Sequence, residues 1–314
     1  MTAWRIAVDR GGTFTDVLAV RGATVRQAKV LSHGQCAIVR GLRAVLSLGP
    51  NDPLPIDEIA EVRLGTTLAT NALLTRTGAK TVLVTTRGFR DLPLIGDQRR
   101  PDLFALQIKR PDPVAAMILE ADERLGNDGQ IVHSLDQDRL HKDLQEAKAA
   151  GCTAVAIALL HGWKHNIHER AAAAVAHAVG FDEVVTSRVS PVQGLIRRTD
   201  TCSLDAALTP VLQGALTRTR EELGDVPIQC MQSSGGLVGL DEFRGARAVL
   251  SGPAGGLLGA ASVARAHEAT EIVAFDMGGT STDVSWCGGV LERETDTVLA
   301  GVRVSVPMLR VHTV

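Results

Sequence analysis

The chain has 314 residues, of which 45% are hydrophobic, and a formal net charge of -2 at pH 7. This length predicts about two domains, each large enough to bury a core. The near-neutral charge argues against nucleic-acid partners, and no apolar stretch approaches the ~20 residues that span a bilayer. We therefore expect a cytoplasmic protein without membrane or nucleic-acid partners.

The order of the predicted elements indicates an α/β protein, because strand-like and helix-like segments alternate along most of the chain. The predicted strands are residues 4–9, 13–20, 24–31, 61–65, 81–86, 154–160, 228–231, 290–297 and 302–306. The predicted helices are residues 36–48, 67–76, 138–150, 167–179, 201–223 and 253–267. Gly78 and Gly180 are expected to end the second and fourth of these helices.

Residues 88–136 interrupt this alternation with a stretch rich in proline and arginine. Proline prevents a continuous helix or a central strand here. Loops inserted into a regular scaffold are where recognition residues concentrate, so we expect this insertion to form part of a substrate pocket. A solvated surface loop is the alternative.

Neither the histidines nor the cysteines form a pattern that predicts a metal site. His161, His165 and His168 lie within eight residues, but Asn166 is expected to cap a helix, which takes them off one common face. The five cysteines are scattered singly, without Cys-x-x-Cys spacing, which is typical of buried thiols.

A nine-residue phrase occurs twice, as Asp9-Arg10-Gly11-Gly12-Thr13-Phe14-Thr15-Asp16-Val17 and as Asp276-Met277-Gly278-Gly279-Thr280-Ser281-Thr282-Asp283-Val284. Seven of the nine positions are identical. Each copy follows an apolar run, which predicts a strand, a tight glycine turn and a second strand. Paired glycines let backbone N–H groups approach a phosphate, and an aspartate beside them can hold Mg²⁺, so the phrase indicates a metal–nucleotide site. An ordinary Gly-Gly hairpin is the alternative.

Residues 251–256, Ser-Gly-Pro-Ala-Gly-Gly, precede a predicted apolar helix. Backbone N–H groups at such a helix start can bind an anion. Close packing of a small-residue helix against a sheet explains the segment equally well.

The chain resembles the hydantoinase A and 5-oxoprolinase family over essentially its whole length. The repeated phrase carries the resemblance together with residues 65–74, 86–91 and 251–256, while Arg10 and residues 198–210 look closer to the 5-oxoprolinases. The resemblance implies the ribonuclease-H-like fold of the actin, Hsp70 and sugar-kinase superfamily, in which two such hairpins hold ATP.

The activity that the resemblance implies is ATP-dependent opening of a cyclic amide, of the 5-oxoproline or hydantoin type, by phosphorylation of its carbonyl oxygen. This chain would be the nucleotide-binding part, with ATP and Mg²⁺ as cofactors. Asp9 and Asp276 are then the expected metal ligands and catalytic residues, whereas Asp16 and Asp283 can equally be structural. The expected phosphate-binding residues are Gly11, Gly12, Thr13, Thr15, Gly278, Gly279, Thr280 and Thr282.

We expect residues 1–270 to form the first ribonuclease-H-like domain, with the insertion around 88–136, and residues 271–314 to form the first strands of a second. Because no covering helices follow these strands, a hydrolytic partner subunit, a C-terminal domain or a homo-oligomer is expected to cover them. The alternatives are a non-catalytic nucleotide-dependent switch, a small-molecule kinase of the same superfamily, and an inactive fragment.

Overall fold

The computed structural model describes residues 3–33, 37–98, 103–107, 112–277 and 282–313. The chain divides into two compact units. Unit 1 comprises Met1–Thr75, Val211–Glu294 and Pro307–Val314, and unit 2 comprises Arg76–Pro210 and Thr295–Val306. Each unit includes residues on both sides of position 270. The two units therefore divide the chain differently from the expected domains 1–270 and 271–314, and those domains stay a prediction.

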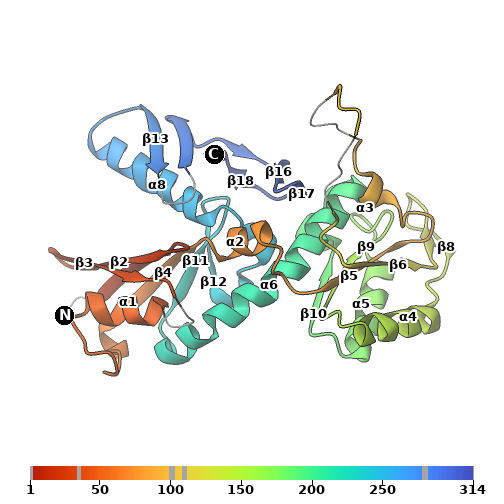
Figure 1. Cartoon of the computed structure of the whole chain (residues 1–314), viewed down its shortest axis with the longest axis horizontal. Coiled ribbons are helices and arrows are strands. Elements are labelled where there is room, and N and C mark those ends of the chain that lie inside the picture. Colours follow the sequence, from red (N-terminus) through yellow and green to blue (C-terminus); the bar gives the residue numbers. More distant parts are fainter. Residues whose placement is uncertain (1–2, 34–36, 99–102, 108–111, 278–281, 314) are drawn as a thin grey trace. The chain divides into compact units, whose positions relative to one another are not determined.

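Unit 1 contains a six-stranded sheet with the order β12-β11-β4-β1-β2-β3 (Figure 1). Its strands are β1 (Trp4–Arg10), β2 (Phe14–Arg21), β3 (Thr24–Leu31), β4 (Ile59–Thr66), β11 (Ile228–Met231) and β12 (Leu237–Gly239). β1, β2 and β3 are consecutive antiparallel strands, β4 is parallel to β1, and β11 is parallel to β4. This is the ribonuclease-H-like arrangement, so the expected fold class is confirmed.

The two faces of this sheet differ because side chains alternate along each strand. Ile6 and Val8 of β1 and Val17 of β2 are buried on the face that helix α1 (Ala37–Val45) covers. Asp9 and Leu18 lie on the opposite, exposed face. The sheet therefore has one packed face and one face available to a ligand.

Gly41 allows α1 to approach the sheet closely. A Cβ atom at this position would lie 2.6 Å from Val17 Cγ2. Because the core on this side is packed, Gly41→Ala should lower the free energy of unfolding by about 1–3 kcal/mol in urea titrations. The control is Gly214→Ala on an exposed part of helix α6 (Leu195–Leu223), where an added Cβ atom would meet nothing within 4 Å. Alanine at this position should raise the free energy of unfolding by up to about 1 kcal/mol. Equal effects of the two substitutions would contradict the packing argument.

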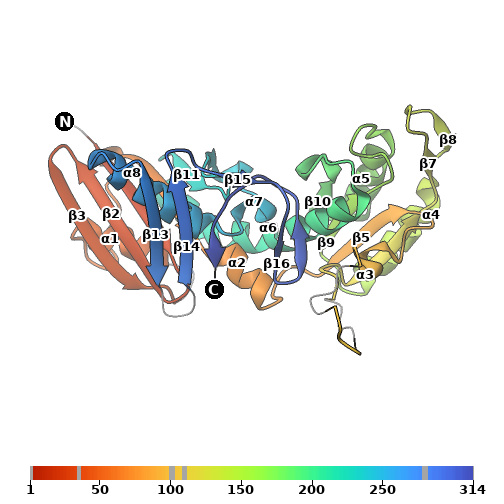
Figure 2. The same cartoon turned by 90° about the horizontal axis from the view of Figure 1, so that it is seen from above.

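The rest of unit 1 is built around helix α8 (Ser251–Ala266) and an antiparallel hairpin, which are seen together in Figure 2. The hairpin strands β13 (Glu271–Met277) and β14 (Thr282–Gly288) pack on α8 through Leu257, Ala261 and Cys287. The smaller elements of unit 1 are α2 (Leu68–Leu74), α7 (Gly245–Ala248), η1 (Ile56–Glu58), η3 (Leu240–Glu242), β15 (Arg293–Glu294), β18 (Met308–Leu309) and β19 (His312–Thr313).

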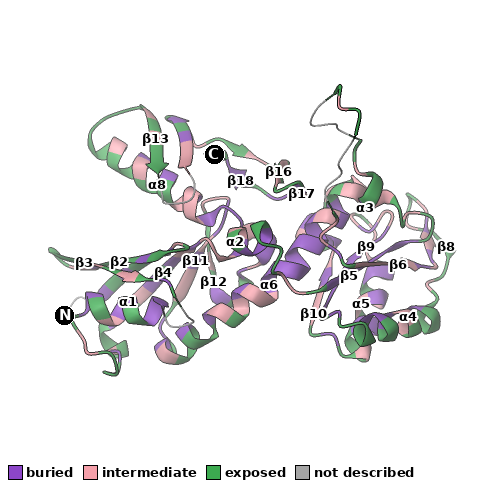
Figure 3. Cartoon of the chain, viewed as in Figure 1, coloured by how far each residue is buried: buried purple, intermediate pink, exposed green. Residues whose placement is uncertain are grey.

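Unit 2 is a parallel sheet with helices on both faces. Its strand order is β10-β9-β5-β6, with β5 (Thr81–Thr86), β6 (Met117–Ala121), β9 (Ala154–Ala158) and β10 (Glu183–Thr186). Helices α4 (Gln137–Ala149) and α5 (Ile167–Val179) cover one face, and the first half of α6 packs on the other. All residues of β5 and β9 are buried, as expected for central parallel strands (Figure 3).

The small elements of unit 2 are α3 (Leu92–Ile95), η2 (Ser187–Val189), β7 (Arg124–Leu125), β8 (Ile131–His133), β16 (Thr297–Leu299) and β17 (Val302–Val304). The expected insertion around 88–136 contributes α3, β6, β7 and β8. Since β6 is an edge strand, the prediction of no central strand is confirmed for residues 88–98, 103–107 and 112–136, which the structure describes.

Most predicted elements are confirmed, and four expectations differ in detail. Helix α2 ends at Leu74 with Thr75 as its C-cap, so Gly78 does not end it. Helix α6 begins at Leu195 rather than at residue 201. Asn166 does precede α5, but its side chain makes no capping hydrogen bond. The predicted strand 290–297 is broken into the short strands β15 and β16. Among the described helices, none combines the length and apolar character needed to cross a bilayer.

Candidate functional site

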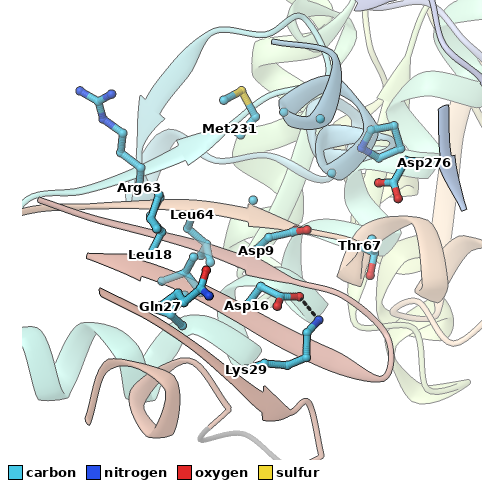
Figure 4. A pocket seen from close by; sticks show the side chains of 18 of the residues that line it. Asp9, Asp16, Leu18, Gln27, Lys29, Arg63, Leu64, Thr67, Met231 and Asp276 are labelled. Atoms are coloured by element: carbon cyan, nitrogen blue, oxygen red, sulfur yellow. Dashed lines mark hydrogen bonds and ion pairs between the residues drawn. The ribbon is translucent and has the colours of Figure 1, made fainter. Parts of the chain in front are cut away.

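A cavity of about 830 Å³ lies over the exposed face of the sheet in unit 1 (Figure 4). One side is formed by β1, β2, β3 and β4, and the other includes the start of α8 and the hairpin β13–β14. Small-molecule sites are typically cavities of ~300–1,000 Å³. The charged and polar lining residues are Asp9, Asp16, Gln27, Lys29, Arg63, Thr67, Asp276 and Asp283.

The two copies of the repeated phrase form two hairpins of the same register. Asp9 pairs with Asp16 across β1 and β2, and Asp276 pairs with Asp283 across β13 and β14. Directly paired residues of antiparallel strands point to the same face. Each hairpin therefore contributes two carboxylates to the cavity, and all four line it. The sequence left open whether Asp16 and Asp283 are structural; their position makes them candidate site residues.

The carboxylates affect one another electrostatically. Burial raises the pKa of Asp9 above its usual value of 3.8, and Asp16 and Asp276 raise it further, while Lys29 lowers it. The Asp9 side chain is still accessible from the cavity. Lys29 Nζ lies 2.6 Å from Asp16 Oδ2, as the dashed line in Figure 4 shows. Lys29 and Arg63 supply two positive charges against the four carboxylates of the lining, so the cavity favours a cation.

The donor set fits Mg²⁺ held together with phosphates. In the described part of the chain, no three His, Cys, Asp or Glu side chains form a ready-made metal cage. Mg²⁺ usually binds through one or two carboxylates, with water and substrate phosphates completing its shell. Asp9 and Asp276 match that requirement, since Asp276 on one hairpin is near enough to raise the pKa of Asp9 on the other.

The start of α8 supplies the cavity with small residues. Gly252, Gly255 and Gly256 line it, and a Cβ atom at Gly256 would meet nothing within 4 Å. The first backbone N–H groups of a 16-residue helix favour an anion. Ser251 instead donates a hydrogen bond of 2.9 Å to the Thr66 carbonyl and is fully buried. The packing alternative is thus confirmed at Ser251, whereas anion binding by the helix start stays a prediction.

The first glycine turn adjoins the cavity but is not part of its described lining. The Gly11 N–H donates to the Phe14 carbonyl at 3.0 Å, while Gly12 and Thr13 are exposed. Neither glycine has a positive φ. A Cβ atom on Gly11 would lie 3.0 Å from the Phe14 carbonyl oxygen, which favours glycine there, whereas a Cβ atom on Gly12 would lie 3.4 Å from Asn71 Nδ2, an ordinary contact.

Thr15 and Thr282, both expected to bind phosphate, lie in different surroundings. Thr15 is fully buried on the α1 side of the sheet, where its hydroxyl lies 2.9 Å from Ser32 Oγ. It therefore faces away from the cavity. Thr282 begins β14 and pairs with Met277. Gly278, Gly279 and Thr280 lie outside the described residues.

The histidines and cysteines make separate contacts in the described part of the chain. His168 Nδ1 lies 2.6 Å from Glu123 Oε2, whereas His165 Nε2 lies 3.1 Å from the Asn127 carbonyl. Four cysteines are described, and all are buried free thiols, namely Cys152, Cys202, Cys230 and Cys287. Burial raises the pKa of the Cys230 thiol to about 12, which opposes a nucleophilic role.

Comparison with known proteins identifies the family. A model of the hydantoinase/oxoprolinase N-terminal region matches residues 5–180, and a hydantoinase/oxoprolinase model matches residues 198–314. The chain belongs to the hydantoinase/oxoprolinase family. The 5-oxoprolinase of Saccharomyces cerevisiae is 37% identical over 357 aligned residues, which cover 99% of this chain and 28% of the yeast protein.

Two solved structures share the fold. The ATP-dependent caprolactamase from Pseudomonas jessenii matches with a TM-score of 0.82 and 30% identity over 99% of this chain and 48% of that one. A nucleotide-free acetone carboxylase matches with a TM-score of 0.87 and 21% identity over 100% of this chain and 48% of that one, which shows a common fold alone. The chain thus spans about half the length of these solved chains.

Asp9→Asn should stabilise the protein in the absence of ligand. Because its pKa is raised on folding, Asp9 holds its proton more tightly in the folded state, and stability falls as pH rises from 3.8 toward the raised value. The substitution should raise the thermal midpoint at pH 7, and the gain should shrink as the pH approaches 4. The control is Asp57→Asn on the exposed helix η1, which should change little. A lower midpoint for Asp9→Asn at pH 7 would contradict the proposed repulsion.

Proposed function

We propose that this chain binds Mg·ATP in the cavity of unit 1 and belongs to an enzyme that opens a cyclic amide with ATP. The observation that carries the proposal is the convergence of two equivalent aspartate pairs and an open helix start on one cavity. The names of two relatives, 5-oxoprolinase and ATP-dependent caprolactamase, support the cyclic amide as substrate class.

ATP provides the driving force that an unstrained cyclic amide requires. The amide carbon is a poor electrophile, because nitrogen shares its lone pair with the carbonyl group. Transfer of the γ-phosphoryl group to the carbonyl oxygen would leave ADP and create a phosphate leaving group. Water would then add to the carbon, and the ring C–N bond would break as the nitrogen takes up a proton, which leaves an acyl phosphate. A second water would release phosphate and the free carboxylate. Phosphoryl transfer depends mainly on positioning and charge neutralisation, which is what a cavity of carboxylates, metal and helix N–H groups can supply.

Asp9 and Asp276 would hold Mg²⁺, which neutralises phosphate charge when it is bound. The backbone N–H group of Gly252, in the first turn of α8, would face a phosphate oxygen, and Gly255 and Gly256 of the next turn would leave room for it. Lys29 is a further candidate, which the sequence did not indicate. Its ammonium group lines the cavity beside Asp16, so it can exchange that carboxylate for a phosphate oxygen.

Ring opening would be shared with another polypeptide segment or subunit. The chain covers 47% of a relative named caprolactamase subunit alpha, from Pseudomonas jessenii, and that name implies at least one further subunit. We place the hydrolytic half-reaction in such a partner or in a C-terminal domain.

Asp9→Asn and Asp276→Asn should each weaken Mg-dependent ATP binding at least about tenfold, since a charge-assisted contact contributes ~1.5–3 kcal/mol. Calorimetry with and without Mg²⁺ measures this effect. The effect should be small when Mg²⁺ is absent, and Asp57→Asn is the control outside the cavity. Unchanged Mg·ATP affinity in both cavity variants would show that the repeated phrases are structural turns.

Lys29→Met should weaken the binding of ATP more than the binding of adenosine, because the proposed contact is with phosphate. The loss should diminish as salt is raised, since salt screens the exposed ammonium group. Equal losses for ATP and adenosine would place Lys29 away from the phosphates.

The reaction itself is tested by product analysis of the natural protein with any chain that copurifies. Release of ADP, phosphate and a ring-opened amino acid only when a cyclic amide is present supports the proposal. A stable phosphorylated product would indicate a small-molecule kinase. A rate of ATP hydrolysis that cyclic amides do not change would indicate a nucleotide-dependent switch.

A further inference from the structure

The cavity of unit 1 extends along the sheet beyond its carboxylates. Strand register places one row of residues side by side across β3, β2, β1 and β4, namely Lys29, Asp16, Asp9 and Gly65. The next row on the same face consists of Gln27, Leu18, Ala7 and Arg63, and all four line the cavity. Two residues of a strand span about 7 Å, so this second row lies about that far from the carboxylates that would hold Mg²⁺.

The side chains of the second row are open to the cavity. Leu18 is 42% exposed, the Arg63 side chain is 50% exposed, and Gln27 is exposed as well. Figure 4 shows these three residues on one side of Asp9, with Asp276 on the other. Ligand sites combine an apolar surface with a few polar groups that fix orientation. The second row has this composition, since Leu18 lies between an amide and a guanidinium group.

Gln27 offers the cavity an amide group that is not already engaged. Among the described residues, none forms a hydrogen bond with its side chain. A carboxamide carries an acceptor oxygen and an N–H donor side by side. A ring holds its own amide in the cis form, so its N–H and carbonyl oxygen also lie side by side. The two groups are complementary and can form a pair of hydrogen bonds.

Arg63 supplies positive charge at the other end of the second row. Arg5 Nε and Arg63 Nη2 lie 3.1 and 3.0 Å from the same oxygen, Glu61 Oε1. Two guanidinium groups thus share one carboxylate, which leaves a net positive charge at this place. Of the two, Arg63 lines the cavity. Its remaining N–H groups suit a carboxylate on a ligand.

The second row also has a suitable width and position for a small ring. Gln27 lies on β3 and Arg63 on β4, with β2 and β1 between them. Neighbouring strands are ~4.8 Å apart, so the main chains of the two residues are about 14 Å apart. Their long side chains can therefore reach both ends of a ring that rests on Leu18 and Ala7. Such a ring would adjoin the row of carboxylates, and phosphoryl transfer requires an acceptor placed next to the phosphate.

We propose that the second row binds the cyclic substrate, with Gln27 pairing with its amide and Arg63 with a carboxylate on its ring. This assignment rests on the proposed function, from which it takes the cyclic amide. The Gln27 oxygen would accept the substrate N–H, which moves electron density onto the substrate carbonyl oxygen. The Gln27 N–H would donate to one lone pair of that oxygen and leave the other free for the γ-phosphorus. The preferred substrate is then a cyclic amide with an acidic substituent.

The carboxylate contact is tested with 5-oxoproline and 2-pyrrolidinone, which differ only in the carboxylate. Calorimetry uses the natural protein with Mg²⁺ and β,γ-imido-ATP, an analogue that resists hydrolysis. 5-Oxoproline should bind at least about tenfold more tightly, because it adds a charge-assisted contact. Arg63→Met should remove most of this preference. Arg5→Met is the matched control and should keep it, because Arg5 contacts the same oxygen of Glu61 but is not among the lining residues.

The amide contact is tested with 5-oxoproline and its N-methyl form. A site that pairs with an N–H group rejects an analogue without it, so 5-oxoproline should bind about tenfold or more tightly. Gln27→Met keeps the length of the side chain and removes its amide, so it should lose most of this discrimination. Gln229→Met is the matched control and should retain it, because Gln229 pairs with Arg63 in the sheet but is not among the lining residues.

All four variants should bind Mg·ATP as the natural protein does. Retention of a preference in the variant meant to remove it would overturn the role of that residue. Weaker adenosine binding in Gln27→Met and Arg63→Met would place the base of the nucleotide on the second row and overturn the assignment. If neither cyclic amide bound the natural protein, the substrate class would be rejected as well. The nucleotide site would still be decided separately, by the Asp9 and Asp276 variants.

Discussion

The repulsion between carboxylates that face one cavity is the constraint on which the proposed chemistry of unit 1 depends. Burial raises the pKa of Asp9 most, and the neighbouring Asp16 and Asp276 raise it further. A fold that gathers these groups lowers its own stability unless a cation joins them. In the proposed function, Mg·ATP would bring that cation together with an anion for the start of α8. The arrangement that costs the empty protein stability would then give the proposed site a preference for a metal–nucleotide.

The sequence predicted the hairpins well, because a repeated phrase after an apolar run specifies strand, turn and strand locally. It also indicated Asp9 and Asp276, because a carboxylate that can hold a metal lies next to the paired glycines in the same phrase. It did not indicate Lys29, and it left Asp16 and Asp283 undecided, because their roles depend on which face of a strand meets a cavity. The burial of Thr15 against Ser32 illustrates the same limit. Its neighbour Asp16 faces the cavity, and only the strand register determines which of the two side chains does so.

A cluster of three side chains in unit 2 shows a second limit on sequence reasoning. Asp97, Asp200 and Arg303 come from an insertion, a long helix and a short strand. No motif connects them, and only the folded chain brings them into contact. The sequence did suggest that residues 88–136 recognise a substrate, which is the general tendency of inserted loops. The contact that Asp97 of that insertion makes depends on Arg303, from the far end of the chain.

The equal register of the two hairpins restricts how this protein can change during evolution. Six residues separate Asp9 from Asp16 and six separate Asp276 from Asp283. Strand side chains alternate, so inserting or deleting one residue in a strand on either side of the turn would move one aspartate of the pair to the opposite face. Residues between the aspartates can be substituted, as the difference between Arg10 and Met277 at the same position of the two copies shows. The number of residues between the aspartates, however, has to stay the same. Alignments of distant relatives should therefore keep this spacing even where the residues between the aspartates differ.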